Sequence, residues 1–98
     1  MIPWPDELVP NIPKACDLVN KINDWRNEDG DIEIEIYMSK EEAEAYFSKL
    51  KDLGISEHGA YVSGDVLHLE GSDPDFNLIC SYFMEGQYLR IKYYYKNY

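Results

Sequence analysis

The strongest constraint on the fold is the pattern of apolar residues on either side of Glu85-Gly86. A turn at this glycine joins two alternating segments, 76–83 and 88–95. One face of the resulting hairpin carries only apolar or aromatic side chains, paired as Tyr82 with Leu89, Cys80 with Ile91, Leu78 with Tyr93 and Phe76 with Tyr95. A slip by one residue would mix apolar and polar side chains on both faces, so the pattern predicts this hairpin in this register.

Two segments have the spacing of amphipathic helices. The first begins at Pro13, a residue favoured at the first helical position, and ends near residue 27 before Glu28-Asp29-Gly30. The second follows Ser39, which forms a capping box with Glu42, and ends at Gly54. The apolar stripes are Leu18, Ile22 and Trp25 in the first helix, and Ala43, Tyr46, Phe47, Leu50 and Leu53 in the second.

The remaining elements are strands. Residues 31–38 alternate strictly between isoleucine and polar or aromatic residues. Strands 57–62 and 65–70 are expected to form a first hairpin that turns at Ser63-Gly64, so the hairpin of 76–95 is the second. The order is therefore α-β-α-β-β-β-β. It predicts an α+β fold, with one mostly antiparallel five-stranded sheet and both helices on one face.

The chain is expected to be a single domain over residues 1–98. Residues 1–12 form an extended, proline-rich arm that Trp4 holds against a globular body of residues 13–98. The last strand is also a candidate neighbour of the first strand. In that order we expect Glu33 and Glu35 to face Arg90 and Lys92 as a cross-strand ladder of opposite charges.

The charge balance points to a binding partner. Asp and Glu total 19 against 9 Lys and Arg, giving a formal net charge of −10, and no Lys or Arg lies between Lys51 and Arg90. Like charges on a small body repel one another and lower its stability, so folding does not need this excess. A basic partner protein is the interpretation we favour, and solubility alone is the alternative.

Both charged and apolar residues are available for such a contact. Aromatic side chains on the outer side of the second hairpin supply anchors, although the N-terminal arm and Trp4, or a second copy in a homodimer, are equally suited to cover them. The carboxylates are Glu33, Glu35, Glu41, Glu42, Glu44, Asp73 and Asp75, and the apolar anchors are Tyr37, Phe83, Tyr88 and Tyr94.

Catalytic and metal-binding signals are weak. His58 and His68 are expected on opposite faces of their hairpin, where His58 faces Leu69 and His68 faces Gly59. No phosphate-binding, nucleophile-elbow or zinc motif is present, so we predict no enzyme activity, metal or cofactor. Glu33 and Glu35 are a possible acid–base pair, but they fit a solvated face better. The few cations also disfavour direct nucleic-acid binding.

The cellular setting is predicted from what the sequence lacks. Cys16 and Cys80 are too few for a disulfide framework, and we interpret them as small buried residues in a reducing compartment. The N-terminus has no signal-peptide pattern, and no apolar run is long enough to span a membrane. We therefore expect a soluble cytoplasmic protein, in the host cytoplasm if a phage encodes it.

The acidic chain and its expected element order resemble the phage-type uracil-DNA glycosylase inhibitors. The strand Glu33-Ile34-Glu35-Ile36-Tyr37-Met38 and the helix start Lys40-Glu41-Glu42 are similar to that family's Glu-Ser-Ile strand and Pro-Glu-Glu helix start, although no Ser follows Glu35. The resemblance implies a DNA mimic, in which Glu35 matches the motif glutamate and Met38 lines an apolar pocket.

These observations predict a small acidic inhibitor that blocks the basic nucleic-acid-binding surface of a uracil-DNA glycosylase, a CRISPR-type complex or another host enzyme. The alternatives are an immunity protein that neutralises a cationic toxin, a small enzyme or ligand-binding domain, and a dimeric housekeeping domain without inhibitory role.

Overall fold

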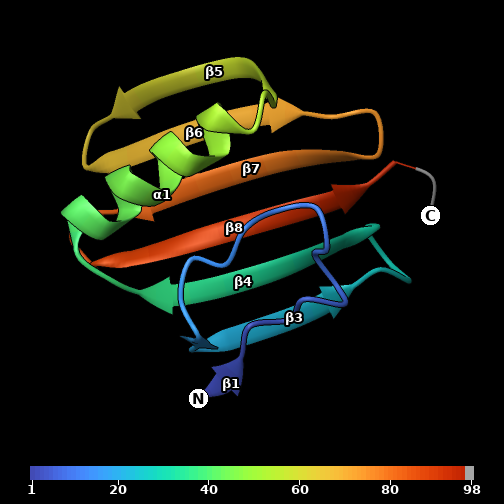
Figure 1. The fold of residues 1–98 in the computed structure, drawn as a ribbon. Helices are drawn as coiled ribbons and strands as arrows, with labels where there is room; N and C mark the ends of the chain where they lie inside the picture. Colours follow the sequence, from blue (N-terminus) through green and yellow to red (C-terminus); the bar gives the residue numbers. More distant parts are fainter. Residues whose placement is uncertain (97–98) are drawn as a thin grey trace.

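One face of a six-stranded antiparallel sheet is covered by a helix and by residues 1–20, called the N-terminal segment (Figure 1). The protein is seen in a computed structural model, which describes residues 1–96 except for the side chains of residues 56–58. The elements are β1 (Ile2–Pro3), β2 (Leu18–Val19), β3 (Lys21–Trp25), β4 (Asp31–Tyr37), α1 (Lys40–Asp52), β5 (Ser56–Ser63), β6 (Val66–Ser72), β7 (Phe76–Phe83) and β8 (Tyr88–Tyr95). The large sheet has the order β3-β4-β8-β7-β6-β5, and β1 and β2 form a separate pair.

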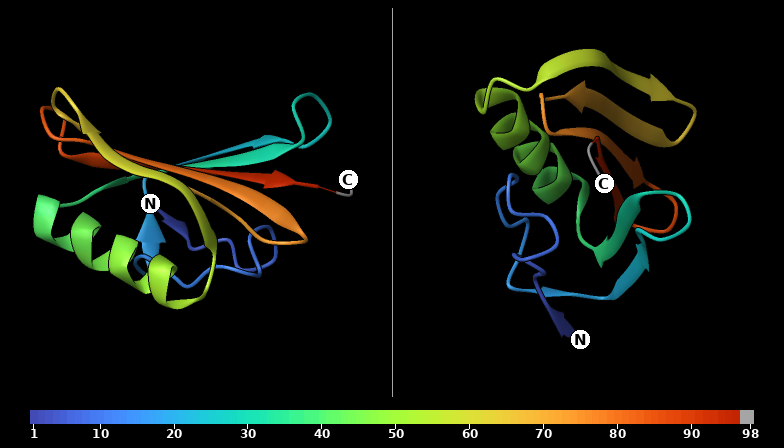
Figure 2. Two further views of the ribbon diagram at one scale, coloured as in Figure 1. Left: turned by 90° about the horizontal axis from the view of Figure 1, so that it is seen from above. Right: turned by 90° about the vertical axis from the view of Figure 1, so that its right-hand side faces the viewer.

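The core lies between the sheet and the segments that cover it. Strict alternation buries Ile32, Ile34 and Ile36 of β4 and their counterparts on β7 and β8 on this covered face. Helix α1 contributes Ala43, Tyr46, Phe47 and Leu50, which follow one side of the helix. Figure 2 shows α1 and the N-terminal segment on the same side of the sheet, while the other side faces away from both.

Local signals fix both ends of α1. The Ser39 hydroxyl accepts from the Glu42 backbone N–H at 3.2 Å, and the Glu42 carboxylate accepts from the Ser39 N–H at 3.0 Å. This confirms the predicted capping box, and Gly54 follows the helix in the left-handed region with φ of 77°. The helix therefore begins directly after β4 and turns back across the sheet.

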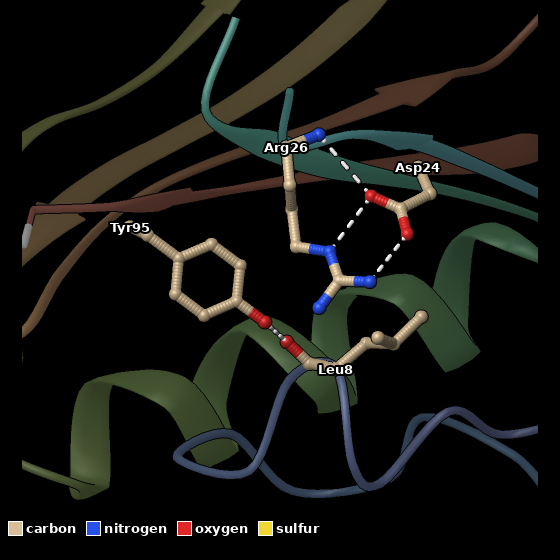
Figure 3. Close-up of polar contacts among 4 residues, drawn as sticks. All are labelled: Leu8, Asp24, Arg26 and Tyr95. Atoms are coloured by element: carbon tan, nitrogen blue, oxygen red, sulfur yellow. Dashed lines mark hydrogen bonds and ion pairs between the residues drawn. The ribbon is translucent and has the colours of Figure 1, made fainter. Parts of the chain in front are cut away.

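The N-terminal segment is part of the core. Trp4 is 4% exposed and meets Tyr46 of α1 edge-on, with 6.4 Å between ring centroids. The Tyr46 hydroxyl donates to the Pro13 carbonyl at 2.7 Å, and the Tyr95 hydroxyl donates to the Leu8 carbonyl (Figure 3). These contacts confirm that Trp4 holds the segment against the body.

The predicted five-stranded α+β fold with two helices is wrong. The structure is mostly β, with two sheets of two and six strands and one helix among residues 1–96. The expected helix over 13–27 is instead β2, β3 and a turn, in which Gly30 has φ of 78°. Asp29-Gly30 thus closes a hairpin between β3 and β4, and the Arg26 guanidinium beside it donates to Asp24 at 2.8 and 2.6 Å (Figure 3).

The second hairpin has the predicted register. Tyr82 pairs with Leu89 and Cys80 with Ile91, and the same register continues to Phe76 and Tyr95. The predicted neighbourhood of the first and last long strands is also confirmed, because Glu33 lies opposite Lys92 and Glu35 opposite Arg90 in the β4–β8 pair. Apolar alternation on these strands leaves one register that keeps the isoleucine and leucine side chains of β4 and β8 on one face.

The predicted register of the first hairpin is wrong. Ser63 pairs with Val66, so the turn residues are Gly64 and Asp65 rather than Ser63 and Gly64. Gly64 has φ of 60°, a conformation that favours glycine at the first turn position. His68 consequently lies opposite Tyr61 and not Gly59, and the side chain of His58 is outside the described residues.

Candidate functional site

The candidate site is the face of the large sheet that α1 and the N-terminal segment leave free, called the open face from here on. In Figure 2 no described segment lies over this side of the sheet. Register and alternation assign to it Lys21, Asn23, Trp25, Asp31, Glu33, Glu35, Tyr37, Gly59, Tyr61, Ser63, Val66, His68, Glu70, Ser72, Asn77, Ile79, Ser81, Phe83, Tyr88, Arg90, Lys92 and Tyr94. It therefore mixes charged, polar and aromatic side chains.

Three rings and one guanidinium form a continuous group on β4, β7 and β8, called the aromatic–arginine cluster. Phe83 and Tyr88 stack with centroids 4.7 Å apart, and Tyr37 meets Tyr88 edge-on at 6.1 Å. The Arg90 guanidinium carbon lies 5.1 Å from the Phe83 ring centroid, within the range of a cation–π contact. Tyr37 is 68% exposed, so the cluster ends in an accessible ring.

Arg90 also joins this cluster to the carboxylates of β4. Its Nη2 donates to Glu35 Oε1 at 3.1 Å, and its Nε lies 3.8 Å from Glu33 Oε1. These ion pairs are partly exposed, so their main effect is to fix the position of the guanidinium over the rings. The β4 carboxylates are thereby partly neutralised within the chain.

Six of the predicted contact residues lie on the open face. They are Glu33, Glu35 and Tyr37 on β4, Phe83 on β7, and Tyr88 and Tyr94 on β8. The suggestion that Trp4 and the arm cover the outer aromatic side chains is wrong, because Trp4 packs against Tyr46 on the opposite side of the sheet.

The other predicted residues lie elsewhere. Glu41, Glu42 and Glu44 are exposed on α1, beyond the covered face, and Glu42 is used in the helix cap. Asp73 and Asp75 occupy the β6–β7 loop at the end of the sheet away from Tyr37. Met38 packs against the core, and its carbonyl accepts from the Tyr82 hydroxyl at 2.8 Å. The carboxylates therefore surround the molecule and do not form a single surface.

A second group of side chains on the open face, beside the aromatic–arginine cluster, was not predicted from the sequence. Tyr61 stacks on His68 with centroids 4.8 Å apart, and His68 Nδ1 lies 3.0 Å from the Ser81 hydroxyl. The correct turn at Gly64-Asp65 is the signal that places Tyr61 opposite His68. The residues of β3 were also missed, because their strand was assigned to a helix.

The open face has two shallow hollows and no deep pocket among the described residues. One, of about 380 Å³, lies beside Lys21, Glu35, Tyr37 and Tyr88. The other, of about 400 Å³, lies beside Ile79 and Tyr94, toward the opposite end of the strands. Open hollows of this kind favour a macromolecular contact over an enclosed small ligand.

Asp31 is an unusual member of the open face. Asp31 is only 3% exposed, and its Oδ1 has no hydrogen-bond partner. Burial raises the pKa of Asp31, and the nearby carboxylates of Asp29 and Glu33 raise it further, while Lys92 opposes the shift. Burial also raises the pKa of Tyr94, and the carboxylates of Asp31, Asp29 and Glu33 raise it further.

Further features of the described part of the chain concern metal ligands, thiols and helix length. Residues 1–55 and 59–96 contain no group of three or more His, Cys, Asp or Glu side chains placed to hold a metal ion. Both cysteines are free thiols, and burial raises the pKa of Cys16 and Cys80 away from the reactive range. Within the same residues no helix has the length and apolar character that a membrane span requires.

Comparisons with other proteins return no match: no family model, no curated protein sequence and no solved structure is similar to the chain.

Proposed function

We propose that the chain is a small acidic protein-binding inhibitor that places its open face on the basic nucleic-acid-binding surface of a host enzyme or defence complex. The observation that supports this is the position of the aromatic–arginine cluster. Its rings lie on a sheet face that no described segment covers, and Tyr37 is the most exposed of them. The chain that carries this face has a formal net charge of −10.

Charge and aromatic side chains act at different ranges in this proposal. The net negative charge attracts a basic partner and accelerates encounter at low salt. Tyrosine and arginine then supply close contacts, because they are the residue types that most often dominate binding energy at interfaces. Since Glu33 and Glu35 are paired with Arg90, they contribute to the overall field more than they act as separate phosphate substitutes.

The proposed targets are a uracil-DNA glycosylase or a CRISPR-type complex, in the cytoplasm of a host cell if a phage encodes the chain. The element order that suggested the uracil-DNA glycosylase inhibitors is wrong, because residues 13–27 contain no helix. What still favours such a target is the acidity of the chain and the segment from Glu33 to Glu42. We propose no catalytic activity and no cofactor.

A toxin-neutralising immunity protein is the second candidate. The observation that favours it is the composition of the aromatic–arginine cluster, which is that of a protein–protein contact and contains a cation that DNA lacks. Both candidates predict the same salt-dependent binding, and the identity of the captured partner separates them.

The test is capture of partners from a lysate of the native host on the immobilised chain at low salt, followed by a salt gradient. We expect a nucleic-acid-binding or toxin protein to elute as salt rises. The double variant Tyr37→Ala/Tyr88→Ala is expected to lose this protein, and the matched control Leu53→Ala, an exposed residue after α1, is expected to keep it. Retention that neither salt nor the double variant changes contradicts the proposal.

Two further measurements address the alternatives. Inhibition of purified uracil-DNA glycosylase by the pure chain would identify that enzyme directly, and inhibition is expected to weaken as salt is raised. Sedimentation of the pure chain tests self-association. A dimer in which Tyr37 is hidden assigns the open face to a second copy and contradicts the proposal.

A further inference from the structure

The edge strand β5 has a free side. It is the last strand in the order of the large sheet, and among the described elements only β6 pairs with it. A bare edge presents unpaired backbone N–H and C=O groups that another strand can pair with. Proteins commonly protect such edges with charged side chains, but the described side chains of β5, from Gly59 to Ser63, carry no charge.

The register identifies the backbone groups that point outward. Ser63 and Val66 flank a two-residue turn, so they form a hydrogen-bonded pair, and such pairs alternate along an antiparallel ladder. Tyr61 opposite His68 is then the next hydrogen-bonded pair. The N–H and C=O groups of Ala60 and Val62 are directed away from β6, toward the free edge.

A groove with both apolar and polar lining runs along the same edge. It lies between α1 and the β5–β6 hairpin and has a volume of about 260 Å³. Its apolar lining is Phe47, Ala60, Val62 and Leu67, and its polar lining is Glu44, Ser48 and Lys51 on the helix and Tyr61 and His68 on the hairpin. Val62 is 63% exposed and Tyr61 50% exposed, one on each side of the strand. A strand added to β5 would send alternate side chains into this groove.

The carboxylates around the groove determine which kind of added strand would be complementary to it. Glu44 lines the groove, Asp65 is at the turn of the hairpin, and Glu70 lies opposite Gly59 on β6. Lys51 is the only described cation among the groove residues, and the following residues up to Arg90 include no Lys or Arg. An extended segment with alternating apolar and basic side chains is therefore complementary, and an acidic segment is not.

We infer that the β5 edge and its groove bind an extended basic segment of the partner protein by strand addition. The segment pairs with the backbone of Ala60 and Val62, its apolar side chains contact Phe47 and Leu67, and its basic side chains are attracted by the nearby carboxylates. This inference rests on the proposed function only in assigning the segment to the basic partner. It adds a second contact surface beside the open face.

The direct test uses a peptide in place of the partner. The probe is an acetylated, amidated heptapeptide that alternates lysine and valine and begins and ends with lysine. It is titrated into the isotopically labelled chain at low salt and followed by amide NMR. We expect saturable shifts at Ala60, Tyr61 and Val62 and at Phe47 of α1. Shifts confined to the aromatic–arginine cluster, or no saturable shifts at any residue, overturn the inference.

Three altered peptides separate the contributions. Glutamate in place of lysine tests charge, serine in place of valine tests the groove, and N-methylation of the valines removes backbone donors while keeping both side-chain types. Each change is expected to weaken binding by about tenfold or more, the effect of losing about 1.4 kcal/mol. Equal binding of the N-methylated peptide would exclude strand addition.

A variant of the chain tests the same contact from the other side. Val62→Pro removes an outward N–H, which is a tolerated place for proline on an edge strand, and is expected to weaken peptide binding about tenfold. Val62→Thr keeps the N–H and is expected to lose less. Thermal unfolding checks that Val62→Pro folds, and if it does not, the N-methylated peptide gives the same information with the unaltered chain.

The two proposals fail in different ways. Peptide binding at β5 with no basic partner captured from the host contradicts the proposed function and leaves the edge site intact. Capture of a basic partner that Val62→Pro does not weaken contradicts the edge site and leaves the proposed function intact.

Discussion

The covered and open faces belong to the same strands but carry different chemistry. On β8, Leu89, Ile91 and Tyr93 point into the core, while Arg90 and Lys92 alternate with them on the open face. The covered side gains stability from burying apolar area. The open side holds ion pairs and exposed rings, which stabilise a fold weakly but suit recognition. Mutations should therefore affect stability on one face and binding on the other.

The largest expected effect on stability is at Trp4, which extends the covered face into the N-terminal segment. Trp4→Ala should lower the free energy of unfolding by about 4 kcal/mol, because a buried tryptophan leaves a large cavity. Trp4→Phe should cost less, since the Trp4 Nε1 has no hydrogen-bond partner to lose. Denaturant unfolding measures both. A change below about 1 kcal/mol for Trp4→Ala would show that the segment is not part of the core.

A matched pair of isoleucines compares the two faces directly. Ile91→Ala on the covered face should lower the free energy of unfolding by about 3 kcal/mol. Ile79→Ala on the open face, where Ile79 is half-buried, should cost about 1 kcal/mol. Chemical denaturation of the two variants gives the difference. Equal losses would contradict the assignment of the faces.

Arg90 tests how the open face is held together. Arg90→Ala removes the ion pairs to Glu33 and Glu35 and the contact with the Phe83 ring, and it should cost about 1 kcal/mol of stability because these contacts are partly exposed. Raising salt should reduce the difference from the unaltered chain. Lys92→Ala is the control. A loss of stability well above this expected value would indicate a structural role for Arg90 in the core.

Asp31 provides the smallest effect and a pH dependence. The pKa of Asp31 is raised in the folded chain. At a pH between its unfolded and folded pKa values, the folded chain therefore binds more protons than the unfolded chain. As pH rises through that interval, Asp31 lowers the free energy of unfolding. Asp31→Asn should therefore gain about 1 kcal/mol or less at pH 7. The gain should shrink toward pH 3, where the carboxyl is protonated in both states. Thermal unfolding across pH checks this, and a gain that grows on acidification would contradict it.

The sequence predicts α1, β7 and β8 well because each of these elements has a clear local signal. On β7 and β8, alternation fixes which residues pair, and at α1 a capping box and an apolar stripe coincide. The cross-strand ladder of Glu33 and Glu35 with Arg90 and Lys92 follows once β4 and β8 are neighbours, because alternation places all four side chains on one face. Apart from that neighbourhood, these features depend on local pattern, which a single sequence contains.

The N-terminal part is predicted poorly because its pattern is ambiguous. Leu18, Ile22 and Trp25 have helical spacing, yet Leu18 and Trp25 are substantially exposed and only Ile22 packs against the core. Edge strand β3 contributes little apolar area, so its pairing with β4 and the turn at Gly30 decide its structure. The positions of the predicted carboxylates on different sides of the molecule could not be predicted from the sequence either, because they depend on which side of the sheet α1 covers.

The open face is the surface that we propose contacts a basic partner. Hydroxyl-radical footprinting of the chain, free and bound to its captured partner, tests this proposal because exposed side chains lie on both sides of the molecule. We predict that Tyr37 is protected on binding while Leu18 and Leu53 react as before. Protection of Leu18 and Leu53 with Tyr37 unchanged would contradict it.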